Sequence, residues 1–492
     1  MTRAVSAATG AVLMVGLRWT DRLIGFVSTV ILARLLVPED FGVVAMAAII
    51  VGLADVLLDM GVNITLIQNR TATQDDYNAA WTLRLIQSSL AALLVLAAAE
   101  PAAAYFDDPR VAPVARFLAL SLLLAGCENI GVVEFQKHME FGREFQFFFT
   151  KRIASFLVTI AAAWILENYW ALVIGTLSGR ALGCVLSYTM HSMRPRLSLK
   201  AVRPMLVFSK WNLLRGIGGY LNQNLHRIFV GRRESTAVMG AYSLGGEIAA
   251  LPSSELLAPL NRVLFPVFVK LKHDLVQLKH AFLLALAVQV SVGIPASAGL
   301  IVISNELVHT LLGETWIPAV PFIQILAATN IMQAVGLSGW YLLLALGRAN
   351  LAAYSSWFSV VIFVSLAMLA IPNGGASAIA TLRLAVAAAG FLLFVFLVKR
   401  EFPTFRTLEM LSSIWRPFLA SAFMIIGLLA WPPGDGMTSI LVLLIKIAFG
   451  ASVYTACLVI LWRMVGCPDG AERYLLEKAK LEKVVRRVLR AR

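Results

Sequence analysis

Residues 281–303, AFLLALAVQVSVGIPASAGLIVI, contain no charged side chain. A helix of about 20 apolar residues crosses the hydrocarbon core of a bilayer, so this stretch predicts a membrane-spanning helix. Similar runs recur along the whole chain, and they lack the alternating pattern of strands in a membrane barrel. We therefore expect an all-α integral membrane protein with about 14 transmembrane helices. The predicted spans are 11–35, 41–67, 78–99, 112–133, 148–166, 169–190, 206–230, 237–265, 281–303, 319–346, 352–372, 375–398, 412–431 and 438–463.

The composition excludes a soluble globular protein. Of the 492 residues, 59% are hydrophobic and only 14% are charged, whereas about a quarter of a soluble domain is charged. The net charge of +14 could suggest a nucleic-acid partner. However, the cations lie in short connections between apolar spans, where membrane topology places them. The expected partner is the lipid bilayer, and we expect no nucleic acid.

The basic residues are divided unequally between the two sides of the membrane. With the N-terminus in the cytoplasm, most Lys and Arg residues fall in the even-numbered connections and in the tail after residue 463. The odd-numbered connections carry only Arg34, Arg110, Arg232 and Arg233. Because cytoplasmic loops are enriched in Lys and Arg, we expect a multi-pass protein of the bacterial inner membrane with both termini in the cytoplasm.

Two distant segments resemble each other weakly. Residues 31–46, ILARLLVPEDFGVVAM, and residues 229–244, FVGRRESTAVMGAYSL, each lead from one span through a polar turn into the next span. Gly42 and Gly240 would correspond, which suggests a repeated half, a common plan in transporters. The predicted parts are an N-terminal six-helix lobe at 1–205, a C-terminal six-helix lobe at 206–400, an extra helix pair at 401–463 and a basic cytoplasmic tail at 464–492.

The basic tail has two possible interpretations. From Ala471 to Arg492 it is helix-forming, and apolar residues recur in it at helical spacing. It could lie on anionic lipid as an amphipathic helix. It could equally be a solvated segment that only fixes the topology.

Several ionisable residues fall deep inside the predicted spans, where they are costly and usually face a bundle interior or a wet cavity. In span 7, Arg215, Asn222 and His226 share one polar stripe with Gly219. Lipid cannot satisfy such a stripe, but a water-filled cavity can. The polar lining concentrates in spans 1, 2, 7 and 8, whereas spans 11 and 13 and most of span 14 lack it.

These residues predict a central cavity of net positive charge between the lobes. Arginine binds phosphate oxygens through its planar fork of donors, so the cavity suits an anionic substrate such as a phosphate or diphosphate. The candidate substrate residues are Arg18, Arg22, Arg84, Arg215, Asn222, Gln223 and Arg227. The candidate carboxylates for ion coupling are Asp21, Asp55, Asp59, Glu247 and Glu255.

Structural roles compete with these assignments. Asp21 can form an intrahelical pair with Arg18 or Arg22. Asp55 and Asp59 can pair with the arginines of span 1 as structural contacts. Lys210 and Arg227 lie near span ends and can extend to the interface. His226 could be a proton site, although a hydrogen-bonded histidine that packs between helices is more common.

The sequence contains no catalytic or metal-binding signature. The phosphate loop GxxxxGK[ST] and the hydrolase patterns GxSxG and HExxH do not occur. The four cysteines form neither a CxxC pair nor a metal-ligand spacing. We expect no enzyme, no metal and no bound cofactor.

The N-terminal third resembles a known family. The run from Trp19 to Asp59, above all the ARLL-x-PEDFG stretch between spans 1 and 2, is similar to the polysaccharide-transport (Wzx-type) flippases. These belong to the superfamily, often abbreviated MOP, that includes the multidrug MATE exporters and the lipid II flippases. The segment Glu134–Phe141, EFQKHMEF, matches a similar aromatic and basic loop of that family.

The resemblance implies two six-helix lobes with alternating access. It also implies a sugar unit on undecaprenyl diphosphate, carried to the outer leaflet for exopolysaccharide, capsule or lipopolysaccharide. An ion gradient of H⁺ or Na⁺ is implied as the driving force, and the polymerase and chain-length proteins of the pathway as partners. The alternatives are a MATE-like small-molecule antiporter and a membrane polysaccharide polymerase or ligase. A cationic drug would favour a net acidic cavity, and a polymerase usually carries a sizeable outer loop.

Overall fold

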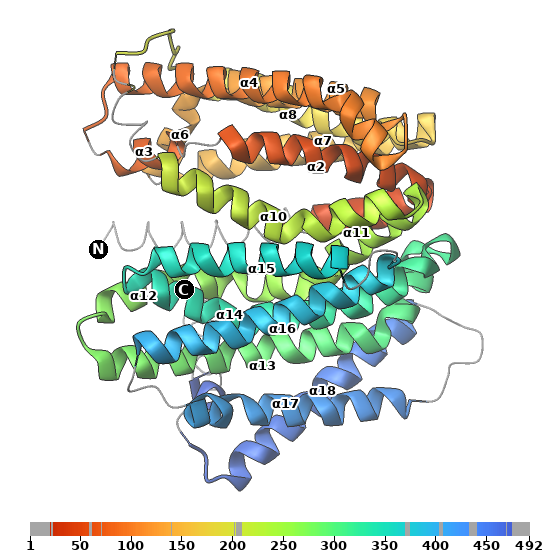
Figure 1. The fold of residues 1–492 in the computed structure, drawn as a ribbon, viewed down its shortest axis with the longest axis vertical. Coiled ribbons are helices and arrows are strands. Elements are labelled where there is room, and N and C mark those ends of the chain that lie inside the picture. The colour runs from red at the N-terminus through yellow and green to blue at the C-terminus, as the bar shows by residue number, and fades with distance from the viewer. Residues whose placement is uncertain are drawn as a thin grey trace, which may run out of the picture. The chain divides into compact units, whose positions relative to one another are not determined.

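The computed structural model describes residues 20, 23–58, 62–69, 71–138, 140–200, 202, 209–369, 374–402, 407–431, 440–468 and 470–474. Within these ranges every regular element is a helix, and none is a strand (Figure 1). The prediction of an all-α protein is therefore confirmed for the described part of the chain.

The described helices are long and apolar enough for a membrane protein. Nine of them pass a length and hydropathy test for a membrane span, and a bent pair brings the number to ten. Two shorter apolar helices, Leu23–Leu35 and Tyr354–Leu369, fall inside predicted spans 1 and 11. The chain is thus a multi-pass membrane protein.

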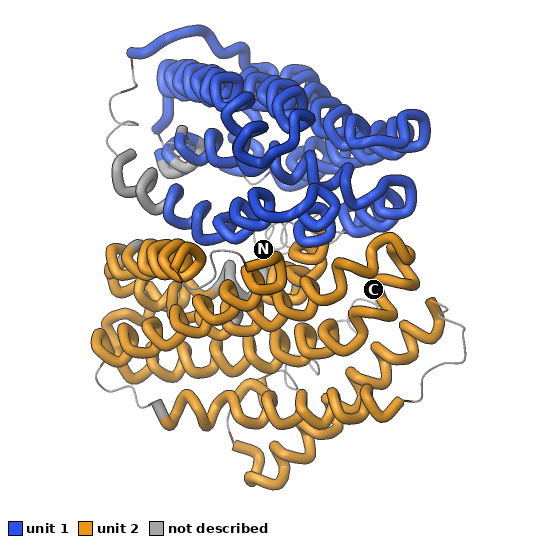
Figure 2. Tube along the Cα trace, turned by 45° about the vertical axis from the view of Figure 1, so that its right-hand side comes forward, with its two compact units in different colours: residues 1–243 blue, residues 244–492 orange. Residues whose placement is uncertain are grey.

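The first compact unit comprises residues 1–243 (Figure 2). Close helix packing within it depends on small residues. A Cβ atom on Gly175 would lie 1.9 Å from Thr159 Oγ1, so α8 can approach α7 only because residue 175 has no side chain. The helices of this unit are α2 (Pro38–Leu58), α3 (Val62–Gln68), α4 (Gln74–Phe106), α5 (Val111–Cys127), η1 (Ile130–Val132), α6 (Val133–Lys137), α7 (Phe141–Leu166), α8 (Trp170–Met190), α10 (Ser209–Arg233) and the start of α11 (Thr236–Leu251).

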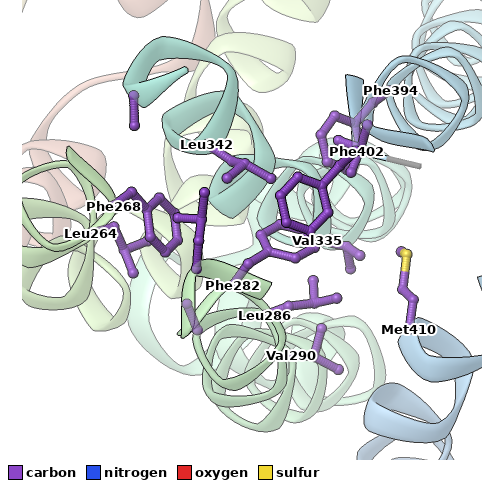
Figure 3. Close-up of a cluster of buried hydrophobic side chains, with 14 of the residues drawn as sticks. Leu264, Phe268, Phe282, Leu286, Val290, Val335, Leu342, Phe394, Phe402 and Met410 are labelled. Carbon is purple, nitrogen blue, oxygen red and sulfur yellow. The ribbon is translucent and has the colours of Figure 1, made fainter. Parts of the chain in front are cut away.

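The second compact unit comprises residues 244–492 and has an aromatic and aliphatic core. Phe268, Phe282, Leu286 and Phe394 are buried there with Leu342 (Figure 3). The helices of this unit are the end of α11, η2 (Pro252–Leu256), α12 (Ala258–Leu271), α13 (Leu275–Leu307), η3 (Val308–Leu312), η4 (Glu314–Ala319), α14 (Val320–Ala345), α15 (Ala349–Leu369), α16 (Ala376–Glu401), α17 (Thr407–Leu429) and α18 (Ile440–Met464).

Two predicted spans are interrupted in the structure. Span 237–265 is not one helix, because a π-helical turn at Pro252–Leu256 separates α11 from α12. Pro252 has no N–H to donate, so the regular α-helical ladder cannot continue through it. Span 112–133 bends by 66° between Cys127 and Ile130. Asn129 caps the second half, since its Oδ1 accepts a 2.9 Å hydrogen bond from the Gly131 N–H.

The PEDFG segment fixes the start of α2. Pro38 is the first residue of the helix, a position where its missing N–H costs nothing. The Asp40 carboxylate accepts hydrogen bonds from the Val37 N–H at 3.1 Å and from the Tyr169 N–H at 2.8 Å. Asp40 therefore ties the start of α2 to the start of α8.

The first turns of α2 and α11 cross at their glycines. A Cβ atom on Gly42 would lie 1.9 Å from the Thr236 carbonyl oxygen, and one on Gly240 would lie 1.8 Å from the Pro38 carbonyl oxygen. In both helices the contacted carbonyl belongs to the residue four positions before the glycine. The two glycines that align in the sequence thus make equivalent contacts with each other's helix.

Candidate functional site

For half of the predicted site residues, the structure describes no side chain. Arg18, Asp21, Arg22 and Asp59 fall outside the described residues. The backbones of Arg215 and Glu255 lie in described helices, but their side chains do not belong to the described part. The geometry that follows concerns Arg84, Asn222, Gln223, Arg227, Asp55 and Glu247.

Helix α10 packs against α2 through Tyr220. The Tyr220 hydroxyl donates a 2.6 Å hydrogen bond to the Ile49 carbonyl oxygen. A Cβ atom on Gly52 would lie 2.7 Å from that hydroxyl, so the phenol fits only over a glycine. A Cβ atom on Gly216 would lie 3.2 Å from Val56, which places the same face of α10 on α2 one turn away.

This α2–α10 contact brings three predicted residues to one region of the first unit. Gln223 and Arg227 follow Gly216 and Tyr220 at helical spacing, so the four lie on one face of α10. Arg227 follows Tyr220 by seven residues on α10, and Asp55 follows Gly52 by three residues on α2, so both lie on the helix faces that meet at this contact. Gln223 and Asp55 are exposed and Arg227 is half-buried. A cation, a carboxylate and an amide therefore border the same contact, and together they could bind a polar or anionic group.

Asn222 and His226 lie on a neighbouring face of α10. His226 is buried, and its Nδ1 lies 2.7 Å from the Tyr242 hydroxyl of α11. This contact fits a histidine that packs between helices better than an exposed proton site. Asn222 is half-buried.

Arg84 belongs to a partly buried group of three charges. Arg84 Nη2 lies 3.2 Å from Glu128 Oε2, and Lys151 Nζ lies 2.6 Å from Glu128 Oε1. The three side chains are only 12–23% exposed. Glu128 is the residue at which the bent span breaks, directly after α5. Two cations share one carboxylate, so the formal charge of the group is +1.

Sequence reasoning missed Glu128 and Lys151 as partners of Arg84. The three residues come from α4, the end of α5 and α7, and no spacing in the sequence links them. Gly183 of α8 adds a constraint, since a Cβ atom there would lie 2.6 Å from Glu128 Oε1. The sequence signal that could have identified Glu128 is its position directly after an apolar run.

The second unit also contains buried charges, which corrects the expectation that span 13 and most of span 14 lack polar residues. Arg416 of α17 and Lys446 of α18 are 6% and 8% exposed. Lys446 Nζ lies 2.7 Å from Glu306 Oε1, and Arg416 Nε lies 3.3 Å from Glu472 Oε1. Glu247 of α11 is exposed. The unexpected partners again come from elements far apart in the sequence.

No metal centre accompanies these groups. Among the described residues, no cluster of three or more His, Cys, Asp or Glu side chains could hold a metal ion. The chemistry that the described side chains offer is ion pairing and hydrogen bonding.

Known proteins are similar to this chain in sequence and in fold. The lipopolysaccharide biosynthesis protein WzxC of Escherichia coli (strain K12) is 26% identical over 423 residues, which cover 84% of each chain. The teichuronic acid biosynthesis protein TuaB of Bacillus subtilis (strain 168) is 24% identical, over 82% of this chain and 85% of its own. The lipid II flippase MurJ in an inward closed conformation superposes with a TM-score of 0.73 at 14% identity, over 91% of this chain and 98% of its own.

A sequence profile gives the family directly. The profile described as polysaccharide biosynthesis protein matches residues 31–321, which include the PEDFG segment, the Glu128 break and all of α10. The match covers more than half of the chain. The protein therefore belongs to the polysaccharide biosynthesis protein family.

Proposed function

We propose that this protein is a flippase that moves a lipid-linked oligosaccharide across the membrane. The observation that carries the proposal is the polar helix α10, packed on α2 in a chain of a polysaccharide biosynthesis family. A helix with Arg215, Asn222, Gln223 and Arg227 is expensive in lipid unless it borders a wet path. Named relatives in lipopolysaccharide and teichuronic acid biosynthesis, and the MurJ-like fold, support transport rather than catalysis.

The substrate we propose is an oligosaccharide on undecaprenyl diphosphate. Its diphosphate carries the negative charge that Arg227 and the other predicted cavity cations attract, and the guanidinium fork binds phosphate oxygens in pairs. The sugar would hydrogen-bond to Asn222 and Gln223. The prenyl chain would remain in lipid while the polar part crosses by alternating access.

The finer arrangement is part of the same proposal. It comprises 14 spans with both termini in the cytoplasm, lobes at 1–205 and 206–400, and a bacterial inner-membrane location. It also includes coupling to H⁺ or Na⁺ through one of Asp21, Asp55, Asp59, Glu247 and Glu255. A reporter fused after Arg492 would test the topology, since a periplasmic signal there would contradict an even number of spans.

Deleting the gene tests the function itself. The expected result is loss of surface polysaccharide with intact lipid-linked oligosaccharide retained in the cytoplasmic leaflet. If single units instead reach the outer leaflet and are not polymerised, the protein acts later, as a polymerase or ligase. If surface polysaccharide is unchanged and small cations are retained, a MATE-like antiporter replaces the flippase.

Substitutions in α10 test the phosphate site. Each charge-assisted hydrogen bond contributes roughly 1.5–3 kcal/mol, so Arg227→Ala should lower export roughly 10- to 100-fold. Arg215→Ala should abolish export while the protein still inserts. Arg227→Lys keeps the charge without the fork and should lie between wild type and Arg227→Ala. Arg232→Ala, exposed at the end of the same helix, is the matched control. Full export by both Arg215→Ala and Arg227→Ala would refute the proposed phosphate site on α10.

A further inference from the structure

The chain after α18 turns back and packs into the second unit. Gly466 and Cys467 adopt left-handed backbone conformations, with φ of 84° and 56°. The Trp462 indole N–H donates a 3.0 Å hydrogen bond to the Pro468 carbonyl oxygen, which closes the turn. Ala471 is then buried against Ala287 and Val288 of α13. Ala471 and Glu472, the first two residues of the segment predicted to be a basic helix, are therefore buried against the protein and are neither solvated nor spread on lipid.

The returning segment places Glu472 beside the buried Arg416. The Glu472 Oε1 atom lies 3.3 Å from Arg416 Nε. The Nε and Nη1 atoms of Arg416 are buried, and neither has a hydrogen-bond partner in the described part of the chain. A guanidinium group has five N–H donors, and burying them without acceptors costs free energy. Arg416 therefore retains donor capacity that Glu472 does not use.

Arg416 is one of the residues that line a cavity of about 310 Å³. His280 of α13 and Ser412 and Ser413 of α17 contribute polar atoms to its wall. Both serine hydroxyls donate 2.8 Å hydrogen bonds to the Glu409 carbonyl oxygen. Their protons are thus used. Nε and Nη1 of Arg416 are closed to solvent, so the side-chain donors on the wall that remain for a ligand are the other N–H groups of Arg416 and the His280 ring. These donors favour an acceptor-rich anion.

The rim of the cavity is apolar. Trp415 and Val465 also line the cavity, and they are 40% and 52% exposed. The cavity lies at the end of the unit where α13 and α17 begin and α18 ends, which is the cytoplasmic end in the topology proposed above. A buried cation inside an apolar rim fits a phosphate group that carries an apolar chain.

We propose that this cavity binds a phosphate group, as found in the headgroup of an anionic phospholipid of the inner leaflet. The Arg416 guanidinium donates to the phosphate oxygens and His280 contacts it from the rim. Glu472 is the resident competitor, because its carboxylate draws on the same guanidinium. This site lies wholly in the second unit and does not depend on the transport substrate.

Ligand-dependent melting of the purified full-length protein tests the site. Phosphatidylglycerol in mixed micelles should raise the unfolding temperature more than phosphatidylethanolamine does, since a ligand that binds only the folded state stabilises it. Inorganic phosphate without lipid separates the two sources. An equal rise with phosphate alone identifies a free-anion site of the same chemistry. If neither phosphatidylglycerol nor phosphate raises the unfolding temperature, the proposal is overturned.

Two substitutions should shift affinity in opposite directions. Glu472→Gln removes the competing charge and should lower the apparent Kd for phosphatidylglycerol several-fold, while His280→Ala should raise it. Arg416→Gln should abolish the selectivity, and if that variant does not fold, the opposed pair still decides the question. A purely structural Arg416–Glu472 pair predicts that Glu472→Gln lowers the melting temperature and leaves lipid selectivity unchanged, which would refute the site.

Discussion

Two groups of cations, one in each unit, are held in different ways. In the first unit, Arg84 and Lys151 both contact one carboxylate, Glu128, at 3.2 and 2.6 Å. In the second unit, Arg416 Nε lies 3.3 Å from Glu472 Oε1, Nε and Nη1 of Arg416 have no hydrogen-bond partner in the described part of the chain, and Arg416 lines a cavity of about 310 Å³. A cation whose donors are used by protein acceptors has a structural role. One with unused donors beside a cavity is placed to bind a ligand.

Glu128→Gln would break the first arrangement and should have the largest effect on stability. It leaves two mostly buried cations beside a neutral amide, and removing one partner of a buried ion pair costs about 3–5 kcal/mol. We expect a loss of about 3 kcal/mol, at the lower end of this range, because the three side chains are 12–23% exposed. Thermal or denaturant unfolding of the purified protein in detergent would measure it.

The matched control is Glu140→Gln. Glu140 pairs with Arg143 at 3.1 Å on an exposed surface, where such pairs contribute about 0–1 kcal/mol. Equal losses for the two variants would show that the Glu128 group is no more important than a surface pair. The comparison between the units would then fail.

Glycine substitutions would compare the rigidity of close packing in the two units. Gly240→Ala places a Cβ atom 1.8 Å from the Pro38 carbonyl oxygen, and Gly339→Ala places one 1.7 Å from the Phe394 ring. A backbone carbonyl in a helix cannot move aside, whereas a ring can rotate. We expect Gly240→Ala to cost about 2 kcal/mol and Gly339→Ala about 1 kcal/mol.

The double variant Gly42→Ala/Gly240→Ala would sharpen this result. Both changes separate α2 from α11 at one crossing, so their free-energy costs should sum to more than the cost of the double variant. Additive costs would mean that the two contacts are independent and that the crossing is not a single unit.

Sequence reasoning was sound for features that depend on local pattern. Apolar runs identified helices. The alignment of Gly42 with Gly240 predicted a repeated half, and it did not predict that each glycine contacts the other's helix. Sequence reasoning failed where the third dimension decides. Glu128, Arg84 and Lys151 meet from three separate elements, and Glu472 reaches Arg416 only because the chain turns back after α18. Pro252 could have indicated a helix break, but the apolar residues around it favoured a continuous span at 237–265.

Asp108 is a second carboxylate of the first unit whose oxygens are bound by neighbouring donors, and it lies outside the spans. Burial raises the pKa of Asp108, but hydrogen bonds from Arg110 and Thr236 outweigh burial and hold that pKa below its usual value of 3.8. Its contribution to stability is therefore present above pH 3.8 and disappears as the pH falls through the lower folded-state pKa. Asp108→Asn should cost about 1 kcal/mol at neutral pH.

Unfolding midpoints of wild type and Asp108→Asn between pH 7 and pH 3 would check this linkage. The gap between the two proteins should be constant above about pH 5 and should narrow below the usual aspartate pKa. A gap that widens on acidification would mean that the folded-state pKa is raised and that burial dominates. The Arg110 and Thr236 contacts would then be too weak to matter.

The smallest effect on stability should come from two glycines at which an added Cβ atom would touch no other described residue. A Cβ atom on Gly219 of α10 or Gly336 of α14 would meet nothing within 4 Å. Alanine in a helix interior is favoured over glycine by about 0.5–1 kcal/mol, so both substitutions should stabilise the protein slightly and equally. Transport should separate them. Gly219 lies on the polar stripe of α10, where an added methyl group narrows the proposed path, so export should fall for Gly219→Ala and remain unchanged for Gly336→Ala. If export remains unchanged in both variants, the space beside Gly219 is not part of the path, and the proposed cavity must lie on another face of α10.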